Sequence, residues 1–352
     1  MTGSTASAAQ SSKPRRGGDF GELSRRVRGA GLLRRRYGYY AARITVNVVL
    51  LAGGGFVFVL LGDSWWQLLT AVLLAGVFTQ FAFIGHDAGH RQIFGSRRGN
   101  DLVGYAHGVV TGISYKWWVG KHNLHHANPN HEDEDPDIEI PALAFSVEQA
   151  RTKRGLLRWV VKYQAFLFFP LLLAEAVMLR IASVQAVLRR EVKATWLEAT
   201  LLAAHMVGYL GVVFLVLSPL KAIVFIVVHQ GLMGVYLGCS FAPNHKGMPI
   251  LGKDERLDYL RKQVLTSRNI LGGRWVDGLL GGLNYQIEHH LFPSMPRPNL
   301  RRAQPLVREF CSRRGISYSH CGLVASYAQV LRHLHAVGAP LRRPRRPVPA
   351  PG

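Results

Sequence analysis

The chain has 352 residues, 48% of them hydrophobic, and a formal net charge of +22. The apolar residues lie in long blocks, which argues against a string of water-soluble domains and favours one membrane-embedded domain. Positive charge gathers at both ends: residues 1–43 hold ten Lys or Arg against two acids, and residues 297–346 hold eleven Arg against one. Beside membrane spans, such basic flanks indicate attraction to anionic lipid on the cytoplasmic side rather than to nucleic acid.

The first part of the chain predicts a basic, disordered segment followed by a membrane hairpin. Residues 1–40 are rich in Arg and small polar residues and contain no secretory signal. The apolar runs at about 41–61 and 65–85 are each long enough to cross a bilayer. The short turn between them returns the chain to the side where it began.

A second hairpin is predicted from spans at about 195–217 and 220–241, which Ser218-Pro219 separates. The apolar segment 156–179 resembles a further span but carries Arg158, Lys162 and Glu175 and is followed by Arg180. We interpret it as a helix in the membrane interface, because a fifth span would place the histidine clusters on opposite sides. Residues 301–340 are then expected to form a helical cytosolic segment, and 341–352 a Pro- and Arg-rich unstructured tail.

Three histidine clusters follow membrane-length segments on the same predicted side. They read His-x3-His from residue 86, His-x2-His-His from residue 122 and Gln-x2-His-His from residue 286. These spacings place the imidazoles of each cluster on one helix face. Neutral imidazole binds iron, zinc, copper or nickel, and seven such ligands exceed the needs of one ion, so two metals are expected. The seven are His86, His90, His122, His125, His126, His289 and His290.

Eight further histidines lie outside the clusters, and one of them is a candidate ligand. His245 directly follows the last span and emerges at the level of the clusters. His205 and His229 fall inside spans, where a hydrogen-bonded neutral imidazole competes with a functional role. The others are expected to be structural or surface residues: His107, His131, His320, His333 and His335. The cysteines, Cys239, Cys311 and Cys321, have no metal-site spacing and are read as reduced thiols.

The three clusters and their flanks resemble the integral-membrane fatty acid desaturases. The resemblance covers residues 40–300 and includes Trp117-Trp118 before the second cluster, Asp135-Pro136-Asp137-Ile138 after it, and residues 286–293. Gln286, where many members have histidine, is typical of the front-end branch and of some stand-alone bacterial members. The resemblance implies an all-α integral membrane fold in which four transmembrane helices, as two hairpins, carry interfacial helices and a cytosolic cap.

The resemblance also implies a di-iron centre that uses O2 and two electrons to insert a cis double bond into an acyl chain. It makes the seven cluster histidines and His245 the iron ligands. Gln286 is either a weak ligand or the holder of a water. Asp87 and Glu288 either orient imidazoles from behind or lie on a solvated helix face. The acidic run 132–139 is expected to be mainly a solvated loop.

The implied partners are a fatty acyl substrate carried by CoA, lipid or a carrier protein, the membrane lipid, and an external electron donor. Neither end shows the His-Pro-Gly-Gly motif of a cytochrome b5 domain, so a ferredoxin, a flavoprotein reductase or a separate cytochrome b5 is expected to supply electrons. The expected setting is a bacterial cell membrane, with both termini and the site in the cytoplasm. The alternatives are a related di-iron lipid hydroxylase and a non-enzymatic metal-handling membrane protein.

Overall fold

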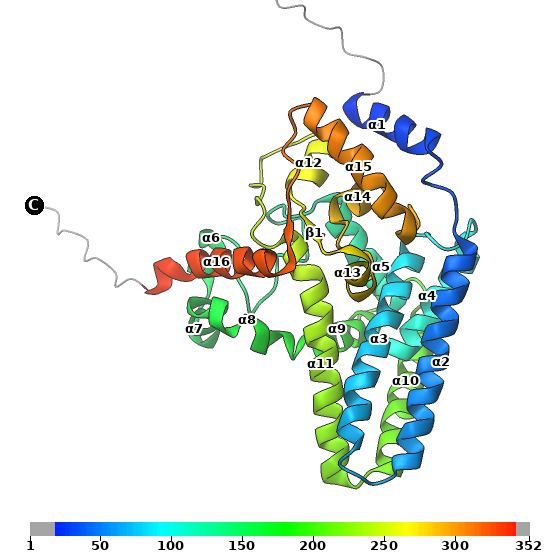
Figure 1. Cartoon of the computed structure of the whole chain (residues 1–352). Helices are drawn as coiled ribbons and strands as arrows, with labels where there is room; N and C mark the ends of the chain where they lie inside the picture. The colour runs from blue at the N-terminus through cyan, green and yellow to red at the C-terminus, as the bar shows by residue number, and fades with distance from the viewer. Residues whose placement is uncertain (1–17, 343–352) are drawn as a thin grey trace, which may run out of the picture.

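Four long apolar helices run side by side and form one end of the molecule (Figure 1). The structure is a computed structural model that describes residues 18–342. Each of these helices is long and apolar enough to cross a bilayer. They are α2 (Tyr37–Leu61), α3 (Gln67–Gly89), α10 (Thr195–Val216) and α11 (Pro219–His245). The two predicted hairpins are therefore present, and α3 and α11 continue past the predicted spans into the first cluster and to His245.

The loops of the two hairpins are joined at the far end of the bundle. Gly62 ends α2 with a positive φ of 55°, which favours glycine. Asp63 then accepts hydrogen bonds from the backbone N–H and the hydroxyl of Ser218, at 2.9 and 3.0 Å. The ammonium of Lys221 lies 3.1 Å from the same carboxylate. These contacts hold the α2–α3 turn against the α10–α11 turn.

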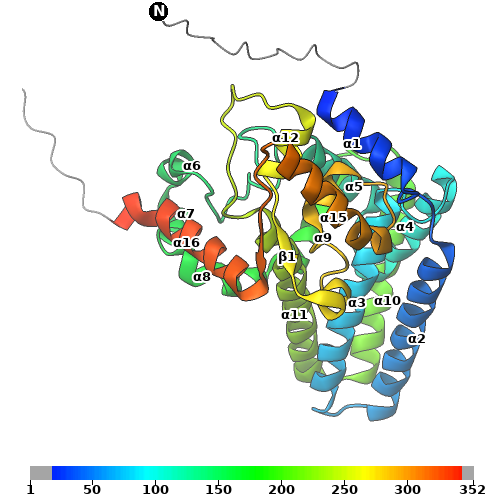
Figure 2. The ribbon, with the colours of Figure 1, turned by 45° about the horizontal axis from the view of Figure 1, so that its top comes forward.

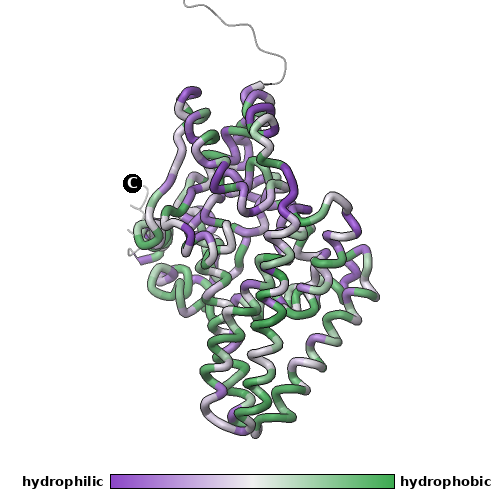
Figure 3. Tube along the Cα trace, turned by 45° about the vertical axis from the view of Figure 1, so that its right-hand side comes forward, coloured by the Kyte–Doolittle hydropathy of each residue, from purple (hydrophilic) through white to green (hydrophobic). Residues whose placement is uncertain are grey.

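The remaining elements form a cap at the other end of the bundle, in which hydrophilic and hydrophobic stretches are mixed (Figure 3). Two short parallel strands, β1 (Asn269–Leu271) and β2 (His320–Gly322), lie among its helices. The cap helices are α1 (Gly18–Gly29), α4 (Arg97–Thr111), α5 (Tyr115–Ala127), α6 (Val147–Thr152), α7 (Gly155–Lys162), α8 (Gln164–Leu172), α9 (Glu175–Leu188), α12 (Tyr259–Leu265), α13 (Gly273–Leu279), α14 (Gln286–Leu291), α15 (Arg297–Arg313) and α16 (Leu323–Arg342).

The N-terminal segment differs from the prediction of disorder over residues 1–40. From Gly18 the chain forms helix α1, which packs beside α15 (Figure 2). Leu23 and Val27, four residues apart on one face of α1, are completely buried in a cluster with Val307 and Phe310 of α15. Tertiary burial of this apolar pair stabilises a helix whose overall composition is polar. Residues 1–17, and the tail 343–352, lie outside the described part.

The apolar segment 156–179 is broken into three helices. α7 and α8 are separated at Tyr163, and α8 and α9 meet at an angle of 70°. Together α8 and α9 are apolar enough for one bent span or a re-entrant loop. The clusters before and after this segment nevertheless meet in one site, as described below. The segment therefore begins and ends on the same side of the bundle, as the parity of the spans predicted.

Candidate metal centre

The first cluster lies at the end of α3. His86 is in its last turn and His90 caps it, with the His90 N–H bonded to the His86 carbonyl at 3.1 Å. One helical turn therefore places both imidazoles on the same face, with ring centroids 4.7 Å apart. Asp87, between them, is 2% exposed and pairs with the guanidinium of Arg297 at 2.7 Å.

The second cluster lies on α5, which is fixed at its first turn. Ser114 caps the helix by accepting from the Trp117 N–H. Glu198 of α10 accepts from the backbone N–H groups of Tyr115 and Lys116, at 3.2 and 2.9 Å. A carboxylate at a helix N-terminus satisfies unpaired N–H groups and opposes the helix dipole. These contacts aim the far end of α5, with His122, His125 and His126, at the end of α3.

The third cluster lies on α14, a short helix that a buried amide anchors. Asn269 of β1 accepts from the Ile287 N–H at 2.9 Å and donates to the Glu288 carboxylate at 2.7 Å. Glu288 also accepts from the Tyr318 hydroxyl at 2.7 Å, and burial raises its pKa to about 7. Glu288 therefore lies neither on a solvated helix face nor against an imidazole. It is buried, and its hydrogen bonds anchor α14.

Eight histidines from the four segments gather in one buried region. Nitrogens of the first group lie within 4.8 Å of one another, as do nitrogens of the second. The first group is His86, His90, His122 and His289, and the second is His125, His245 and His290. His126 lies between the groups: its Nε2 is 3.2 Å from that of His122, and its ring stacks on His290 with centroids 4.1 Å apart.

The second group presents three unprotonated nitrogens to one point. Each imidazole directs Nδ1 at an oxygen acceptor, so in the neutral ring Nδ1 carries the proton and Nε2 keeps its lone pair. These acceptors are Asp135 Oδ1 for His125 at 3.0 Å, the Thr266 carbonyl for His245 at 3.0 Å, and Gln263 Oε1 for His290 at 2.9 Å. The Nε2 atom of His245 lies 3.3 Å from that of His125 and 3.1 Å from that of His290. Two nitrogens bound to one ion at about 2.1 Å have such separations.

For the first group, the observation that supports a metal ion is a set of buried ring nitrogens that have no hydrogen-bond partner within residues 18–342. The Nε2 atoms of His86 and His90, and both ring nitrogens of His289, are buried without a hydrogen-bond partner among the described residues. An unpaired buried nitrogen costs free energy, and several such nitrogens in one place are compensated by a shared cation. The residues present therefore fit two metal ions, one in each group.

Burial also sets the protonation that metal binding requires. Loss of solvent lowers the pKa values of His90, His122, His126, His289 and His290, which keeps these imidazoles neutral. His125 differs. Burial opposes its charge, but Asp135 and Asp137 outweigh burial and raise its pKa. A carboxylate behind an imidazole raises the basicity of a metal ligand.

Several candidates from the sequence occupy other positions. Gln286 is buried with Nε2 2.9 Å from His245 Nε2, so its amide borders the second group. Asp135 belongs to an acidic run expected to be mainly a solvated loop, yet it is completely buried behind His125. His131, expected at the surface, is 2% exposed, and its Nδ1 donates to the Glu132 carbonyl at 2.9 Å.

The intramembrane histidines take the structural role that the sequence left open. His205 Nδ1 donates to the Val109 carbonyl at 2.8 Å, and His229 Nδ1 accepts from the Tyr209 hydroxyl at 2.8 Å. Sequence reasoning missed Gln263 and Thr266, which accept hydrogen bonds from the Nδ1 atoms of His290 and His245. Neither had a signal in one sequence, because they approach the site only through tertiary packing.

A family model described as fatty acid desaturase matches residues 63–322. The chain is 33% identical to an acyl-lipid (9-3)-desaturase of Physcomitrium patens, over 85% of this chain and 58% of that protein. It is 31% identical to a Delta(6)-fatty-acid desaturase of Caenorhabditis elegans, over 90% of this chain and 74% of that protein. The chain is 30% identical to a Delta 8-(E)-sphingolipid desaturase of Kluyveromyces lactis, over 91% of this chain and 59% of that protein. The chain thus spans somewhat more than half the length of two of these three relatives.

Proposed function

Because the chain belongs to the fatty acid desaturase family, we propose that it inserts a cis double bond into a fatty acyl chain at the eight-histidine site. The matched relatives are named for fatty acids, acyl-lipids and sphingolipids, and an acyl chain is what these substrates share. The observation that carries the proposal is the convergence of two imidazole groups in a buried region at the end of the apolar bundle.

Two iron ions held by these imidazoles would supply the redox chemistry with O2 that removal of hydrogen from an unactivated methylene needs, which zinc would not supply. The balanced reaction takes two hydrogen atoms from neighbouring methylenes, one O2, two electrons and two protons, and yields a double bond and two water molecules. His86, His90, His122 and His289 would hold one ion, and His125, His245 and His290 the other, with His126 between them.

The protein contributes position and exclusion of water. Asp135, Thr266 and Gln263 fix the ring orientation and tautomer of their histidines. Gln286 borders the second group, where its amide would either bind the metal or hold a water. Seven of the eight imidazoles are buried and His122 is partly buried, so bulk solvent has little access.

The basic surface of α1 and α15 supports docking of an acidic electron carrier. Asp19 and Glu22 on this surface already pair with arginines, Asp19 with Arg314 at 3.1 Å and Glu22 with Arg26 at 2.6 Å. Within residues 18–342, four exposed arginines there lie beyond ion-pair distance of any acid; they are Arg25, Arg28, Arg302 and Arg308. The surface lies at the end of the molecule opposite the apolar bundle (Figure 1), which favours a soluble partner over the bilayer.

An aromatic contact path leads inward from this surface. The rings of Phe20 and Tyr259 have centroids 4.6 Å apart, and Phe20 also stacks on Phe292 at 5.6 Å. The Tyr259 hydroxyl donates to the backbone carbonyl of the ligand His290 at 2.9 Å. The carrier would deliver one electron at a time over this short, protein-filled distance. By the positive-inside rule the arginine-rich cap faces the cytoplasm, where reduced carriers are available.

Expression in a host that lacks its own desaturase tests the function. Lipids with two fewer hydrogens should accumulate with the unaltered protein and with the exposed-site control His335→Ala, but not with His125→Ala. A product that instead gains one oxygen would identify a hydroxylase. Absence of any new lipid, with a competent electron carrier supplied, would contradict the proposal.

A further inference from the structure

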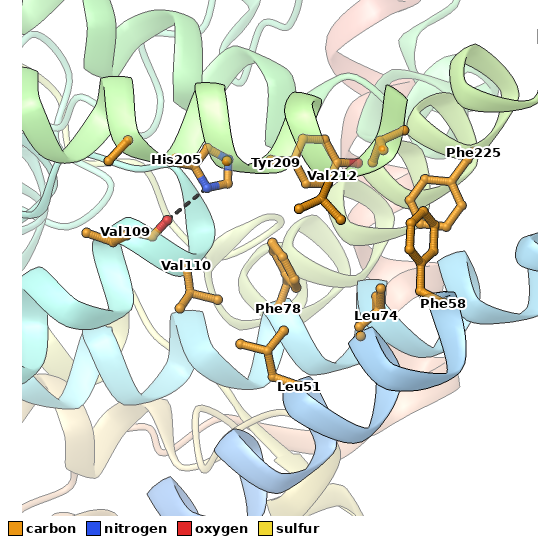
Figure 4. Close-up of a pocket in the computed structure, with 14 residues that line it drawn as sticks. Leu51, Phe58, Leu74, Phe78, Val109, Val110, His205, Tyr209, Val212 and Phe225 are labelled. Carbon is orange, nitrogen blue, oxygen red and sulfur yellow. Dashed lines mark hydrogen bonds between the residues drawn. The ribbon is translucent and has the colours of Figure 1, made fainter. Parts of the chain in front are cut away.

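An apolar cavity of about 310 Å³ lies inside the helical bundle, apart from the eight histidines of the candidate metal centre. Figure 4 shows α10 on one side of it and α2 on the other, with Phe78 of α3 and Val110 of α4 between them. Phe58 and Phe225 close one end. Its volume is at the lower end of the range for small-molecule sites, about 300–1,000 Å³.

The cavity wall is almost entirely apolar, and His205 Nε2 is its one lining side-chain nitrogen or oxygen without a hydrogen-bond partner among the described residues. Tyr209 and His205 are its two lining residues with polar side-chain atoms. The Tyr209 hydroxyl donates to His229, and His205 Nδ1 donates to the Val109 carbonyl (Figure 4). A hydrocarbon is therefore the occupant that this lining suits. An α-helix of a second subunit, about 10 Å across, does not fit a hollow of this volume.

The cavity is open along α10 at a depth that the bilayer would cover. Ala204, Gly208 and Val212 line it and follow one another at intervals of four, so they share one face of the helix. All three are nevertheless exposed. On the opposite side the wall is formed by Leu51 and Gly55 of α2, which are partly exposed. The opening between α2 and α10 therefore faces the space that lipid tails would occupy.

One face of α3 connects this cavity with the metal centre. Leu74 and Phe78 line the large cavity, and Ala82 and His86 follow at the same four-residue interval. Ala82 and His86 line a second cavity of about 50 Å³ beside Trp118. At 1.5 Å per residue, Phe78 lies about 12 Å along the helix from His86.

Helix α4 covers the same seam from the other side. Its residues Val109 and Val110 line the large cavity, while Gly108 and Thr111 line the small one. The two cavities thus occupy neighbouring turns of a single α3–α4 seam.

We propose that the large cavity receives the methyl-terminal part of the acyl chain, which enters sideways from the bilayer between α2 and α10. The substrate is then the acyl chain of a membrane lipid, because a water-soluble thioester would present its chain from the polar end. The inference rests on the proposed function for the identity of the chain as substrate. The cavity itself can be tested without catalysis.

Four glycines provide matched variants. An added Cβ meets nothing within 4 Å at Gly55, Gly208, Gly53 or Gly211, and none has a positive φ. Gly55 and Gly208 line the cavity, whereas Gly53 and Gly211, on the same helices, do not. Leucine at the first pair should fill the cavity or its opening, and leucine at the second pair should add a similar side chain elsewhere on the same helices.

The first measurement is photo-crosslinking of the purified full chain in lipid nanodiscs. The probe is a phosphatidylcholine with a diazirine near the methyl end of one chain, and labelled peptides are mapped by mass spectrometry. We expect labelling of cavity residues such as Phe78 and Leu51, about tenfold weaker in Gly208→Leu and unchanged in Gly211→Leu. Equal labelling in both variants would overturn the inference. So would labelling of the cavity by an acyl-CoA with the same diazirine but not by the phospholipid.

The second measurement is the product profile in the expression host. Gly55→Leu and Gly208→Leu should shift products toward shorter chains, and Gly53→Leu and Gly211→Leu should not. Crosslinking in the cavity without any desaturated product would overturn the proposed function and leave lateral entry standing. Desaturated product with no crosslinking in the cavity would overturn lateral entry and leave the proposed function standing.

Discussion

The guanidinium of Arg297 lies 2.7 Å from the carboxylate of Asp87, and both side chains are no more than 5% exposed. Arg297 begins α15, while Asp87 is the neighbour of the candidate ligand His86 on α3. Arg297 also donates to the Phe83 carbonyl at 2.8 Å. The pair therefore joins the cap to the turn of the bundle that carries the first cluster.

Loss of Asp87 should destabilise the protein strongly. Asp87→Asn leaves a buried guanidinium without its counter-ion, and breaking one side of a buried pair costs roughly 3–5 kcal/mol. We expect a large drop in the apparent Tm of the metal-free protein in detergent. Glu309→Gln, which removes an exposed partner of Arg313 on α15, should change it little. Similar drops for both variants would contradict this role for the pair.

The two imidazole groups should bind metal separately. His290→Ala removes a ligand of the second group only, and His86→Ala a ligand of the first only. Each variant should retain about one of two iron ions per chain, as measured by elemental analysis of purified protein. The exposed-site control His335→Ala should keep both. Loss of all iron from each single variant would show that the groups cannot be filled independently.

Gln263 should act as a positioning residue for the second group. Its Oε1 accepts from His290 Nδ1, and its Nε2 donates to the His126 carbonyl at 2.9 Å. Gln263→Leu removes both contacts and should weaken metal binding about 10- to 100-fold. Gln263→Glu keeps the acceptor and should restore most of the affinity, measured by competition with a chelator. Equal affinities for the leucine variant and the unaltered chain would exclude this role.

Charge reversal on α15 should slow electron delivery. With Arg302→Glu and Arg308→Glu together, we expect reduction of the metal centre by an acidic [2Fe–2S] ferredoxin to be about tenfold slower at low salt. The difference should shrink at high salt, since exposed charges are then screened. Arg154→Glu, an exposed arginine at the start of α7, is the control. Reduction by dithionite should be the same in all variants. A salt-independent defect would point to misfolding rather than to docking.

Strong local patterns made much of this structure predictable. Long apolar runs can satisfy their backbone in lipid only as helices, so the four spans follow from the sequence. The histidine intervals fix which imidazoles share a helix face. Parity of the spans then brings His125 and His289 to one side, and His245 joins them because it directly follows a span.

The rest depended on contacts between distant segments. The sequence could not divide the imidazoles into two groups, because helix packing angles decide which rings meet. It missed α1, whose two buried apolar residues are too few for a strong periodic signal. It also left Asp135 among solvated acids, although the fold turns this carboxylate inward against His125. Burial of a polar residue reflects its tertiary partners and leaves little trace in local composition.

The contact between Asp63 and the Ser218 turn bears on how the lateral opening behaves. This contact holds the far ends of α2 and α10. The near end of α2 is held by the hydrogen bond from Tyr40 to Gln92. The near end of α10 is held by the hydrogen bonds that Glu198 accepts from the start of α5. Because the two helices are fixed at both ends, the opening between them can widen most at its midpoint. Elastic bowing of the two helices would admit a chain at mid-bilayer while the histidines keep their spacing, so lateral entry of the proposed substrate would leave the metal geometry unchanged.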